Sequence, residues 1–173
     1  MRPKQTIRGL PSASGARAFV RVDFNVPLDG STIVEDTRIR AALPTLALLR
    51  AAGTCLVLAS HLGRPKDGPD PALSLRPVAK RLAELMDCDV DLAPDCVGDA
   101  VRRRTAATQP GDVLLLENVR FHPGEEANDP AFARALVDDS HAKVFVNDAF
   151  GTAHRAHAST AGVAAFVDRR VAG

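Results

Sequence analysis

Three polar segments of the chain, each following a short apolar run, carry arginine close to histidine and glycine. They are SHLGRPK (60–66) with His61 and Arg64, ENVRFHPGEE (117–126) with Arg120, and NDAFGTAHRAHAST (147–160) with Arg155. The planar guanidinium of arginine donates paired hydrogen bonds to phosphate and carboxylate oxygens. If the fold brings these segments together, they predict a site for a small, multiply charged phosphorylated anion.

Another polar pair, Asp23 and Asn25, follows the first apolar run, in RVDFNVPLDG (21–30). In an open parallel α/β sheet, ligands bind outside the carboxyl ends of the strands, where such segments meet at one edge. Taken singly, a loop arginine is most often a solvated surface charge, and Asp23 is also consistent with a structural carboxylate. The shared position of the arginines after predicted strands favours a binding site over these alternatives.

Short apolar runs alternate with longer segments of helical period, the pattern of a parallel sheet covered on both faces. The predicted strands are Phe19–Val26, Cys55–Ala59, Val90–Leu92, Val113–Leu116 and Val144–Val146, with Val163–Val167 a last short strand or a helix. The predicted helices are Pro44–Ala51, Leu75–Met86, Val97–Arg104 and Pro130–His141. We therefore expect an α/β fold of three layers: a doubly wound, mostly parallel, Rossmann-like sheet with helices on both faces.

Several predicted helix ends have a chemical cause. Ser74 and Asp129 are suited to cap the helices that follow them, with Pro130 at a first position where a missing N–H costs nothing. Gly53 is placed to end the helix that includes Pro44. The segment 35–43 is either a first helical turn or non-helical, because proline disfavours helical geometry in the residue before it.

Composition narrows the class of protein. The chain has 173 residues, enough for one domain with a sizeable core, and 46% of them are hydrophobic. A formal net charge of +1 argues against a general nucleic-acid or acidic-membrane binder. The sequence shows no signal-peptide pattern and no apolar run of the roughly 20 residues that a spanning helix needs. We expect a cytoplasmic protein.

Other chemistries lack their sequence patterns. There is no G-x-x-x-x-G-K-[ST] phosphate loop, no G-x-G-x-x-G after the first strand, and no G-x-S-x-G nucleophile elbow. Three cysteines without C-x-x-C spacing, and histidines without H-x-x-x-H spacing, predict no metal site. Some remaining polar residues are consistent with simple structural roles. Solvation is expected for 102–104, Glu125 and Glu126, and loop packing is an open alternative for His122, Asp148, His154 and His157.

Five strings resemble, in order and spacing, the N-terminal half of phosphoglycerate kinases. They are RVDFNVPLDG, EDTRIRAALPT, SHLGRPK, ENVRFHPGEEAND and VNDAFGTAHRAHAST, and the likeness runs from about Arg21 to Ala165. The resemblance implies that Asp23 and Asn25 contact the hydroxyl and carboxylate side of 3-phosphoglycerate. It places Arg38 near the reacting carboxylate and the phosphoryl group in flight. It implies a basic patch that holds the substrate phosphate, formed by His61, Arg64, Arg120 and Arg155.

The implied reaction transfers the γ-phosphoryl group of ATP to the carboxylate of 3-phosphoglycerate, reversibly giving 1,3-bisphosphoglycerate and ADP in glycolysis. A carboxylate with a pKa of roughly 3 to 4 is ionised at neutral pH and needs no general base. The obstacle is repulsion between two anions, and arginines are suited to reduce it. Mg-ATP and ADP would be bound by a C-terminal lobe, since residues 1–173 carry none of its nucleotide or metal ligands.

The resemblance therefore predicts that 1–173 is one substrate-binding domain of a two-lobe kinase, monomeric and inactive alone, whose partners are its substrates and the C-terminal lobe. The alternative is a stand-alone binding or regulatory module for a phosphorylated metabolite, without catalysis. The reading frame beyond Gly173 would separate the two hypotheses. Nucleotide-binding loops there would support the kinase, and a native stop codon would support the module.

Overall fold

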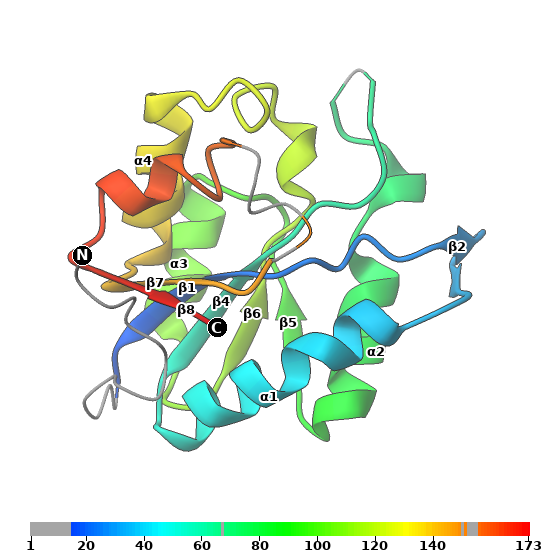
Figure 1. The fold of residues 1–173 in the computed structure, drawn as a ribbon, viewed down its shortest axis with the longest axis horizontal. Helices are drawn as coiled ribbons and strands as arrows, with labels where there is room; N and C mark the ends of the chain where they lie inside the picture. Colours follow the sequence, from blue (N-terminus) through cyan, green and yellow to red (C-terminus); the bar gives the residue numbers. More distant parts are fainter. Residues whose placement is uncertain (1–14, 67, 150, 152–155) are drawn as a thin grey trace.

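The computed structural model describes residues 15–66, 68–149, 151 and 156–173, in which a parallel sheet lies between two pairs of helices (Figure 1). The sheet strands are β1 (Arg17–Arg21), β4 (Cys55–Ala59), β5 (Val90–Leu92), β6 (Val113–Leu115), β7 (Val144–Asn147) and β8 (Arg169–Ala172). Their spatial order is β5-β6-β4-β1-β7-β8, and every neighbouring pair is parallel. The chain thus places β4, β5 and β6 on one side of β1, with β6 between β4 and β5. It then returns to add β7 and β8 on the other side, as in doubly wound folds.

The helices cover both faces of this sheet. The α-helices are α1 (Thr37–Ala51), α2 (Arg76–Met86), α3 (Asp99–Ala107) and α4 (Pro130–Ser140). The 3₁₀ turns are η2 (Pro71–Leu73), η3 (Val119–Phe121) and η5 (Gly162–Ala165). A short antiparallel hairpin of β2 (Leu28–Asp29) and β3 (Thr32–Ile33) projects from one end of the molecule (Figure 1).

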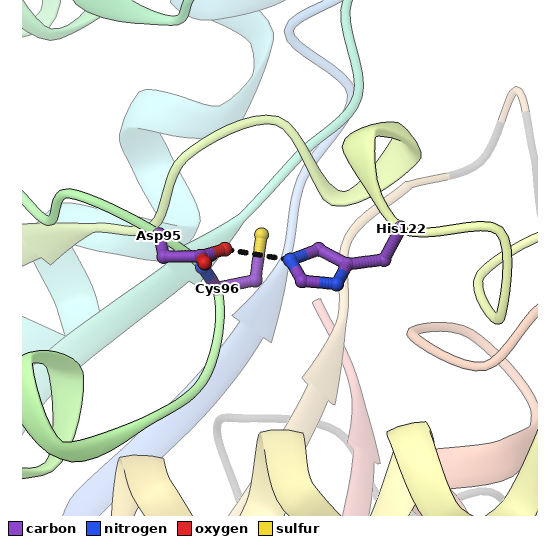
Figure 2. Close-up of side chains that lie close together, drawn as sticks. All are labelled: Asp95, Cys96 and His122. Carbon is purple, nitrogen blue, oxygen red and sulfur yellow. Dashed lines mark hydrogen bonds and ion pairs between the residues drawn. The ribbon is translucent and has the colours of Figure 1, made fainter. Parts of the chain in front are cut away.

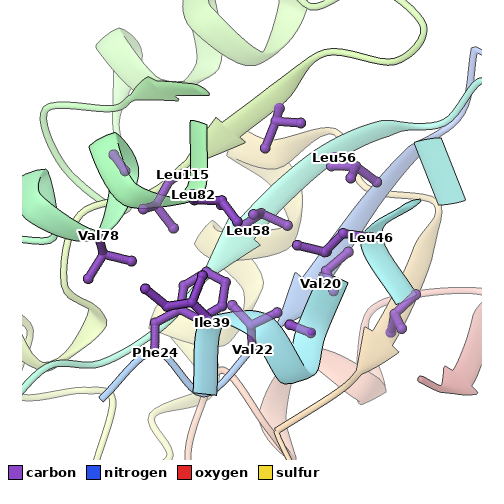
Figure 3. Packing of buried hydrophobic residues seen from close by; sticks show 14 of the residues in the cluster. Val20, Val22, Phe24, Ile39, Leu46, Leu56, Leu58, Val78, Leu82 and Leu115 are labelled. Atoms are coloured by element: carbon purple, nitrogen blue, oxygen red, sulfur yellow. The ribbon is translucent and has the colours of Figure 1, made fainter. Parts of the chain in front are cut away.

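Alternate residues of each central strand face opposite layers, because side-chain direction alternates along a strand. Val20 and Leu58 pack with α1 and α2, in the cluster that Figure 3 shows around Ile39. Phe19 and Val57 belong to the second cluster, which includes residues of α3 and α4. The central strands are therefore apolar on both faces, and the predicted three-layer, doubly wound α/β fold is confirmed.

The first strand is shorter than predicted. It was expected over Phe19–Val26 and ends at Arg21, although Val22, Phe24 and Val26 are all buried. Beyond Val22 the neighbouring strand β4 has ended, and the Phe24 N–H bonds to the Ser60 hydroxyl instead of to a strand carbonyl. Apolar alternation indicated burial correctly here but not the end of the strand.

Helix α1 begins at Thr37, so a start at Pro44 is wrong, and the helical alternative for the segment before Pro44 is confirmed from Thr37 on. Pro44 lies inside the helix, where it lacks the N–H that would bond to the carbonyl of residue 40. Burial of Ile39, Leu46 and Leu49 on one side of α1 offsets this loss. The helix ends at Ala51, and Gly53 follows with a positive φ of 74°, as expected for a helix terminator.

Predictions for the other helix ends had mixed outcomes. Asp129 caps α4 as predicted, with its side chain accepting from the Ala131 N–H. Ser74 also acts as predicted, because its hydroxyl accepts from the Arg76 N–H at 3.2 Å, although α2 itself starts at Arg76 and not at Leu75. The helical alternative for 163–167 is the correct one, since η5 occupies Gly162–Ala165. The predicted start of α3 is wrong by two residues, and strand β8 was not predicted. Among the residues described, no helix is both long and apolar enough to cross a membrane.

Candidate functional site

A polar pocket of about 290 Å³ lies at the carboxyl ends of the central strands. Its lining comes from the segments after β1, β4, β6 and β7, together with the first turn of α1. The lining residues are Asp23, Asn25, Arg38, His61, Gly63, Arg64, Arg120 and Gly151. The structure therefore brings together every predicted site residue that it describes. Arg155 and His154 lie outside the described residues.

Arg38 enters the pocket from α1 and pairs with Asp23. The Arg38 Nη1 donates to Asp23 Oδ2 at 2.6 Å, with side-chain exposures of 50% for the arginine and 14% for the aspartate. A cation in the first turn of a helix opposes the helix dipole, so the ion pair supplies the attraction that the helix does not. Asp23 thus orients the guanidinium of Arg38, which stays half exposed at the pocket.

The loop after β4 is held in place by two contacts to Gly63. Its N–H donates to Asn25 Oδ1 at 2.8 Å, and its carbonyl accepts from Arg120 Nη1, also at 2.8 Å. Gly63 has a φ of +60°, which L side chains rarely adopt, and a Cβ there would lie 2.7 Å from Leu73. A glycine is therefore required for this loop to meet both Asn25 and Arg120.

Arg120 is held more rigidly than Arg64. Its side chain is 6% exposed and its Nε lies 3.2 Å from Glu126 Oε1, while Arg64 is exposed. Asn118, which is fully buried, fixes the segment by accepting from the Arg120 N–H and donating to the carbonyls of Leu62 and Leu73. The side chain of Asn118 therefore fastens the loop after β4 to the segment after β6, a role that sequence reasoning missed.

His61 lines the pocket as a neutral hydrogen-bonding group, unlike the arginines with which the resemblance groups it. Its Nδ1 lies 3.1 Å from Nη2 of Arg21. Because a guanidinium only donates, Nδ1 accepts and the ring proton is on Nε2. Burial, followed by the nearby charge of Arg21 and Arg120, lowers the pKa of His61 to about 3. His61 therefore offers an N–H donor to a ligand instead of a positive charge.

Beneath the pocket lies a group of four side chains, Arg21, His61, Glu125 and Ser159, which we call the buried polar layer. Arg21 is 0% exposed; its Nε donates to Ser159 Oγ at 2.7 Å and its Nη1 to the Val22 carbonyl. Burial lowers the pKa of Arg21, and the charge of Glu125 acts in the opposite direction.

Glu125 was expected to be solvated, and that prediction is wrong. It is 0% exposed and accepts from both the hydroxyl and the N–H of Ser159, at 2.6 and 2.9 Å. Arg21 and Glu125 thus hold opposite charges on either side of one hydroxyl. The only signal in the sequence was a charged residue ending an apolar strand, and nothing in it paired that residue with one more than a hundred positions away.

Two other candidate residues lie away from the pocket lining. His122 places Nε2 2.6 Å from Asp95 Oδ1, and its ring stacks on Phe132 at 4.8 Å between centroids. Asp148 accepts from the Thr45 hydroxyl at 3.2 Å, and burial raises its pKa to about 6. His122 thus has side-chain partners instead of the backbone contacts considered for it.

The pocket combines fixed donors with adjustable cations. Arg120 and the His61 Nε2–H are held by the protein, whereas Arg38 and Arg64 are exposed enough to turn toward a ligand. Its only lining carboxylate among the described residues, Asp23, is already paired with Arg38, so the site suits an anion and not a divalent cation. The volume suits a molecule of a few heavy atoms carrying phosphate or carboxylate.

Comparisons with known proteins agree with the resemblance. The sequence profile of the phosphoglycerate kinase family matches residues 9–173. The chain is 56% identical to the phosphoglycerate kinase of Chloroherpeton thalassium over 162 residues, and 57% identical to that of Acaryochloris marina over 173 residues. These alignments cover 94% and 98% of this chain but 40% and 43% of the two relatives.

Solved structures give the same result. The phosphoglycerate kinase of Coxiella burnetii superposes with a TM-score of 0.87 at 38% identity, covering 99% of this chain and 42% of that one. The enzyme of Pyrococcus horikoshii also gives a TM-score of 0.87, at 29% identity, covering 98% of this chain and 42% of that one. The chain thus spans about two fifths of the length of the proteins that it matches.

Proposed function

The chain belongs to the phosphoglycerate kinase family, and we propose that it is the acceptor-substrate half of such an enzyme, binding 3-phosphoglycerate in the pocket at the carboxyl ends of the strands. The observation that carries this proposal is the convergence of Arg38, Arg64 and Arg120 on one small cavity. No single spacing in the sequence requires that convergence. A trianionic substrate is the kind of ligand for which several arginines around a small volume are useful.

The substrate phosphate is proposed to lie between Arg64 and Arg120, with the His61 Nε2–H as a neutral donor. Arg155 is proposed as a further phosphate ligand from the family resemblance. This end of the pocket is the better fixed one, because Arg120 is nearly buried and tied to Gly63. Phosphate binding by fixed donors needs little reorganisation and therefore orients the rest of the substrate.

The hydroxyl and carboxylate of the substrate are proposed to face Asp23, Asn25 and Arg38. Asn25 uses Oδ1 to accept from the Gly63 N–H, which leaves its Nδ2 as a donor for the ligand. Arg38 is half exposed and held by one carboxylate, so it can exchange Asp23 for an incoming anion. That position suits a group that neutralises negative charge as it moves between two reactants.

The proposed reaction joins the substrate carboxylate to the γ-phosphoryl group that ATP supplies. Because the carboxylate is already ionised at neutral pH, the pocket needs no general base. Its part is to hold the nucleophile in line and to reduce the repulsion between two anions. Closure of two lobes would bring the reactants together and exclude water.

Mg-ATP or ADP is proposed to bind a separate C-terminal lobe, the second partner of this chain. The pocket described here does not fit a magnesium nucleotide, since its volume is small and its lining carboxylate is paired with arginine. We therefore expect the chain alone to show no turnover in a coupled assay with Mg-ATP and 3-phosphoglycerate. Adding a separately produced C-terminal lobe should restore part of the activity, reduced by the lost effective concentration.

The binding proposal can be tested by NMR titration of the chain with 3-phosphoglycerate. Amide shifts should concentrate at 23–25, 61–64, 118–122 and 151–157, and affinity should fall as salt rises because partly exposed arginines meet a polyanion. Arg64→Ala should weaken binding clearly. Arg103→Ala, an exposed arginine of α3 outside the pocket lining, should leave binding unchanged. Shifts scattered over the surface, or equal effects of the two variants, would overturn the proposed site.

A further inference from the structure

Outside the pocket, three side chains that ligate metals in proteins point toward one another. The Asp95 carboxylate, the Cys96 thiol and the His122 imidazole each offer one ligand atom, and these atoms all lie within 4.8 Å of one another (Figure 2). The loop after β5 supplies Asp95 and Cys96, and the residue after η3 supplies His122. No metal-site spacing in the sequence indicated this set, because the aspartate and cysteine are adjacent and the histidine is 26 residues beyond Cys96.

The donor atoms are already close to the spacing of a metal site. Zinc bonds of about 2.0 to 2.3 Å in a tetrahedron place ligand atoms about 3.3 to 3.6 Å apart. The Asp95 Oδ1 and His122 Nε2 are 2.6 Å apart and would open slightly, while the longest separation in the group would close by about 1 Å. Side-chain rotation alone can supply movements of this size.

Local charge favours a cation at the same point. Cys96 is 1% exposed, and its Sγ lies 2.8 Å from the Glu117 carbonyl oxygen. Burial raises the pKa of the Cys96 thiol, and the nearby carboxylates of Asp95, Glu117 and Glu125 raise it further. The nearby charges of Asp95, Glu117 and Glu125 are all negative, which favours a cation over an anion at this point.

We propose that Asp95, Cys96 and His122 form a binding site for one transition-metal cation of the zinc class. On binding, the thiol proton leaves to solvent, a Cys96 sulfur–metal bond forms, and the Asp95–His122 contact is replaced by two bonds to the metal. The fourth position is filled by water from an open cavity of about 560 Å³ that Asp95 and His122 border. Mixed sulfur, nitrogen and oxygen ligands select Zn²⁺, Co²⁺ or Cd²⁺ over Mg²⁺ and Ca²⁺, which prefer oxygen alone.

A bound metal would link the loop after β5 to the segment after β6. Without the metal, these parts meet through the contact between Asp95 and His122 and through two hydrogen bonds of the Glu117 backbone, one to the Asp95 carbonyl and one from the Cys96 thiol. The metal would fasten the loop after β5 to the segment that begins with η3, which carries Arg120. Bound metal should therefore stabilise the fold. At free Zn²⁺ about a hundredfold above Kd, the Tm should rise by about 5 to 10 °C.

The test is titration of the metal-free chain with Zn²⁺ by calorimetry, and with Cd²⁺ by ultraviolet absorption. We expect one cation per chain, a cadmium–thiolate charge-transfer band, release of about one proton per cation, and no competition from excess Mg²⁺. Cys96→Ser and His122→Asn should each weaken binding more than about 100-fold, since losing outer partners alone costs about 10- to 100-fold. Cys88→Ser removes a thiol outside the cluster and should bind as the wild type does.

Cys96 is buried, so misfolding of Cys96→Ser would also abolish binding. His122 is partly exposed, so His122→Asn tests the same site with less disturbance of the core. A circular dichroism spectrum like that of the wild type, with the charge-transfer band lost in both variants, supports the site. Absence of stoichiometric binding overturns it, as does a band that survives Cys96→Ser. The cluster would then be an Asp95–His122 hydrogen bond beside a buried thiol.

Discussion

The first strand of the sheet carries an arginine at each end, and the two are used differently. At the amino end, Arg17 donates to the carbonyls of Thr105 and Ala106, at 2.7 and 3.1 Å, where helix α3 ends. At the carboxyl end, Arg21 is fully buried and bonds to Ser159 and His61, with Glu125 as the opposite charge. One arginine satisfies backbone groups, and the other belongs to a layer of ionisable side chains.

The difference between the two ends has a physical origin. Carbonyls at a helix end lack partners within the helix, so a nearby cation such as Arg17 is stabilising by itself. A buried charge like Arg21 is costly unless other groups compensate it, and the carboxyl end supplies those groups from segments far apart in sequence. Buried charged side chains that lower the stability of the fold and lie beneath a pocket are more consistent with a role in ligand binding than with a role in stabilising the fold. The predictions below test that contrast.

The largest expected effect is on turnover at the carboxyl end. In the complete two-lobe enzyme, Arg38→Ala should lower kcat by roughly 10³-fold or more, the range for arginines that stabilise a phosphoryl-transfer transition state. Its effect on the KM for 3-phosphoglycerate should be much smaller, and Arg38→Lys should rescue only partly because an ammonium lacks the planar fork. Steady-state kinetics with both substrates measures this.

The matched control for Arg38 is its neighbour Arg40, also in the first turn of α1 and about equally exposed, but paired with Asp36 away from the pocket. Arg40→Ala should change kcat less than a few-fold. If Arg38→Ala also stays within a few-fold of the wild type, then Arg38 is a surface ion pair and the catalytic assignment fails.

The next effect is on folding. Glu125→Gln should lower the free energy of unfolding by about 3 kcal/mol, because it leaves the buried Arg21 without its opposite charge. Urea unfolding of the chain measures this loss. Glu126→Gln, at the adjacent position with a side chain 61% exposed, should cost no more than about 1 kcal/mol, because its partner Arg120 also donates to the Gly63 carbonyl. Equal stabilities of the two variants would mean that the buried polar layer is not held together by charge.

These two residues also show where sequence reasoning succeeded and failed. Most strands and helices followed from apolar period, and most candidate site residues from their place after strands, because one sheet edge collects every such loop. Arg38, in helix α1, came only from the family resemblance. Glu125 and Glu126 are adjacent in a polar loop, and nothing local distinguishes the buried one from the exposed one. Its burial depends on Ser159, which approaches only once the chain has folded back.

Helix α1 shows the same limit in another form. Local geometry disfavours a helix before Pro44, yet tertiary burial of Ile39 on the sheet maintains it. Cys96 and His122 likewise met without any recognisable spacing. Residue types and topological position could be predicted from the sequence, but contacts between distant loops could not.

A smaller effect is expected at the amino end of β1. Arg17→Met keeps the apolar stem but removes the hydrogen bonds to α3, so the free energy of unfolding should fall by about 1 to 2 kcal/mol. Binding of 3-phosphoglycerate, followed by calorimetry, should be unchanged. If Arg17→Met weakens binding as strongly as Arg64→Ala does, the two ends of the sheet are coupled and the contrast between them fails.

The smallest effect concerns Asp148, which follows β7 at the carboxyl end. Its Oδ1 accepts from Thr45, its Oδ2 is buried without a hydrogen-bond partner among the described residues, and burial raises its pKa from 3.8 to about 6. Between these two values the folded chain binds more protons than the unfolded chain, so this group makes stability fall as pH rises from about 4 to 6.

Asp148→Asn should therefore stabilise the chain at pH 7 by about 1 kcal/mol, a value kept small because solvent partly screens a group that is only partly buried. The gap between variant and wild type should close as pH falls toward 4, and Tm measured across this range would show it. His61 acts in the opposite direction, since its lowered pKa makes stability fall as pH drops from about 6.5 toward 3. Because wild type and Asp148→Asn both contain His61, the difference between their Tm values at each pH isolates the effect of Asp148. A gap of constant size at all pH values would show that Asp148 contributes through packing and not through its charge.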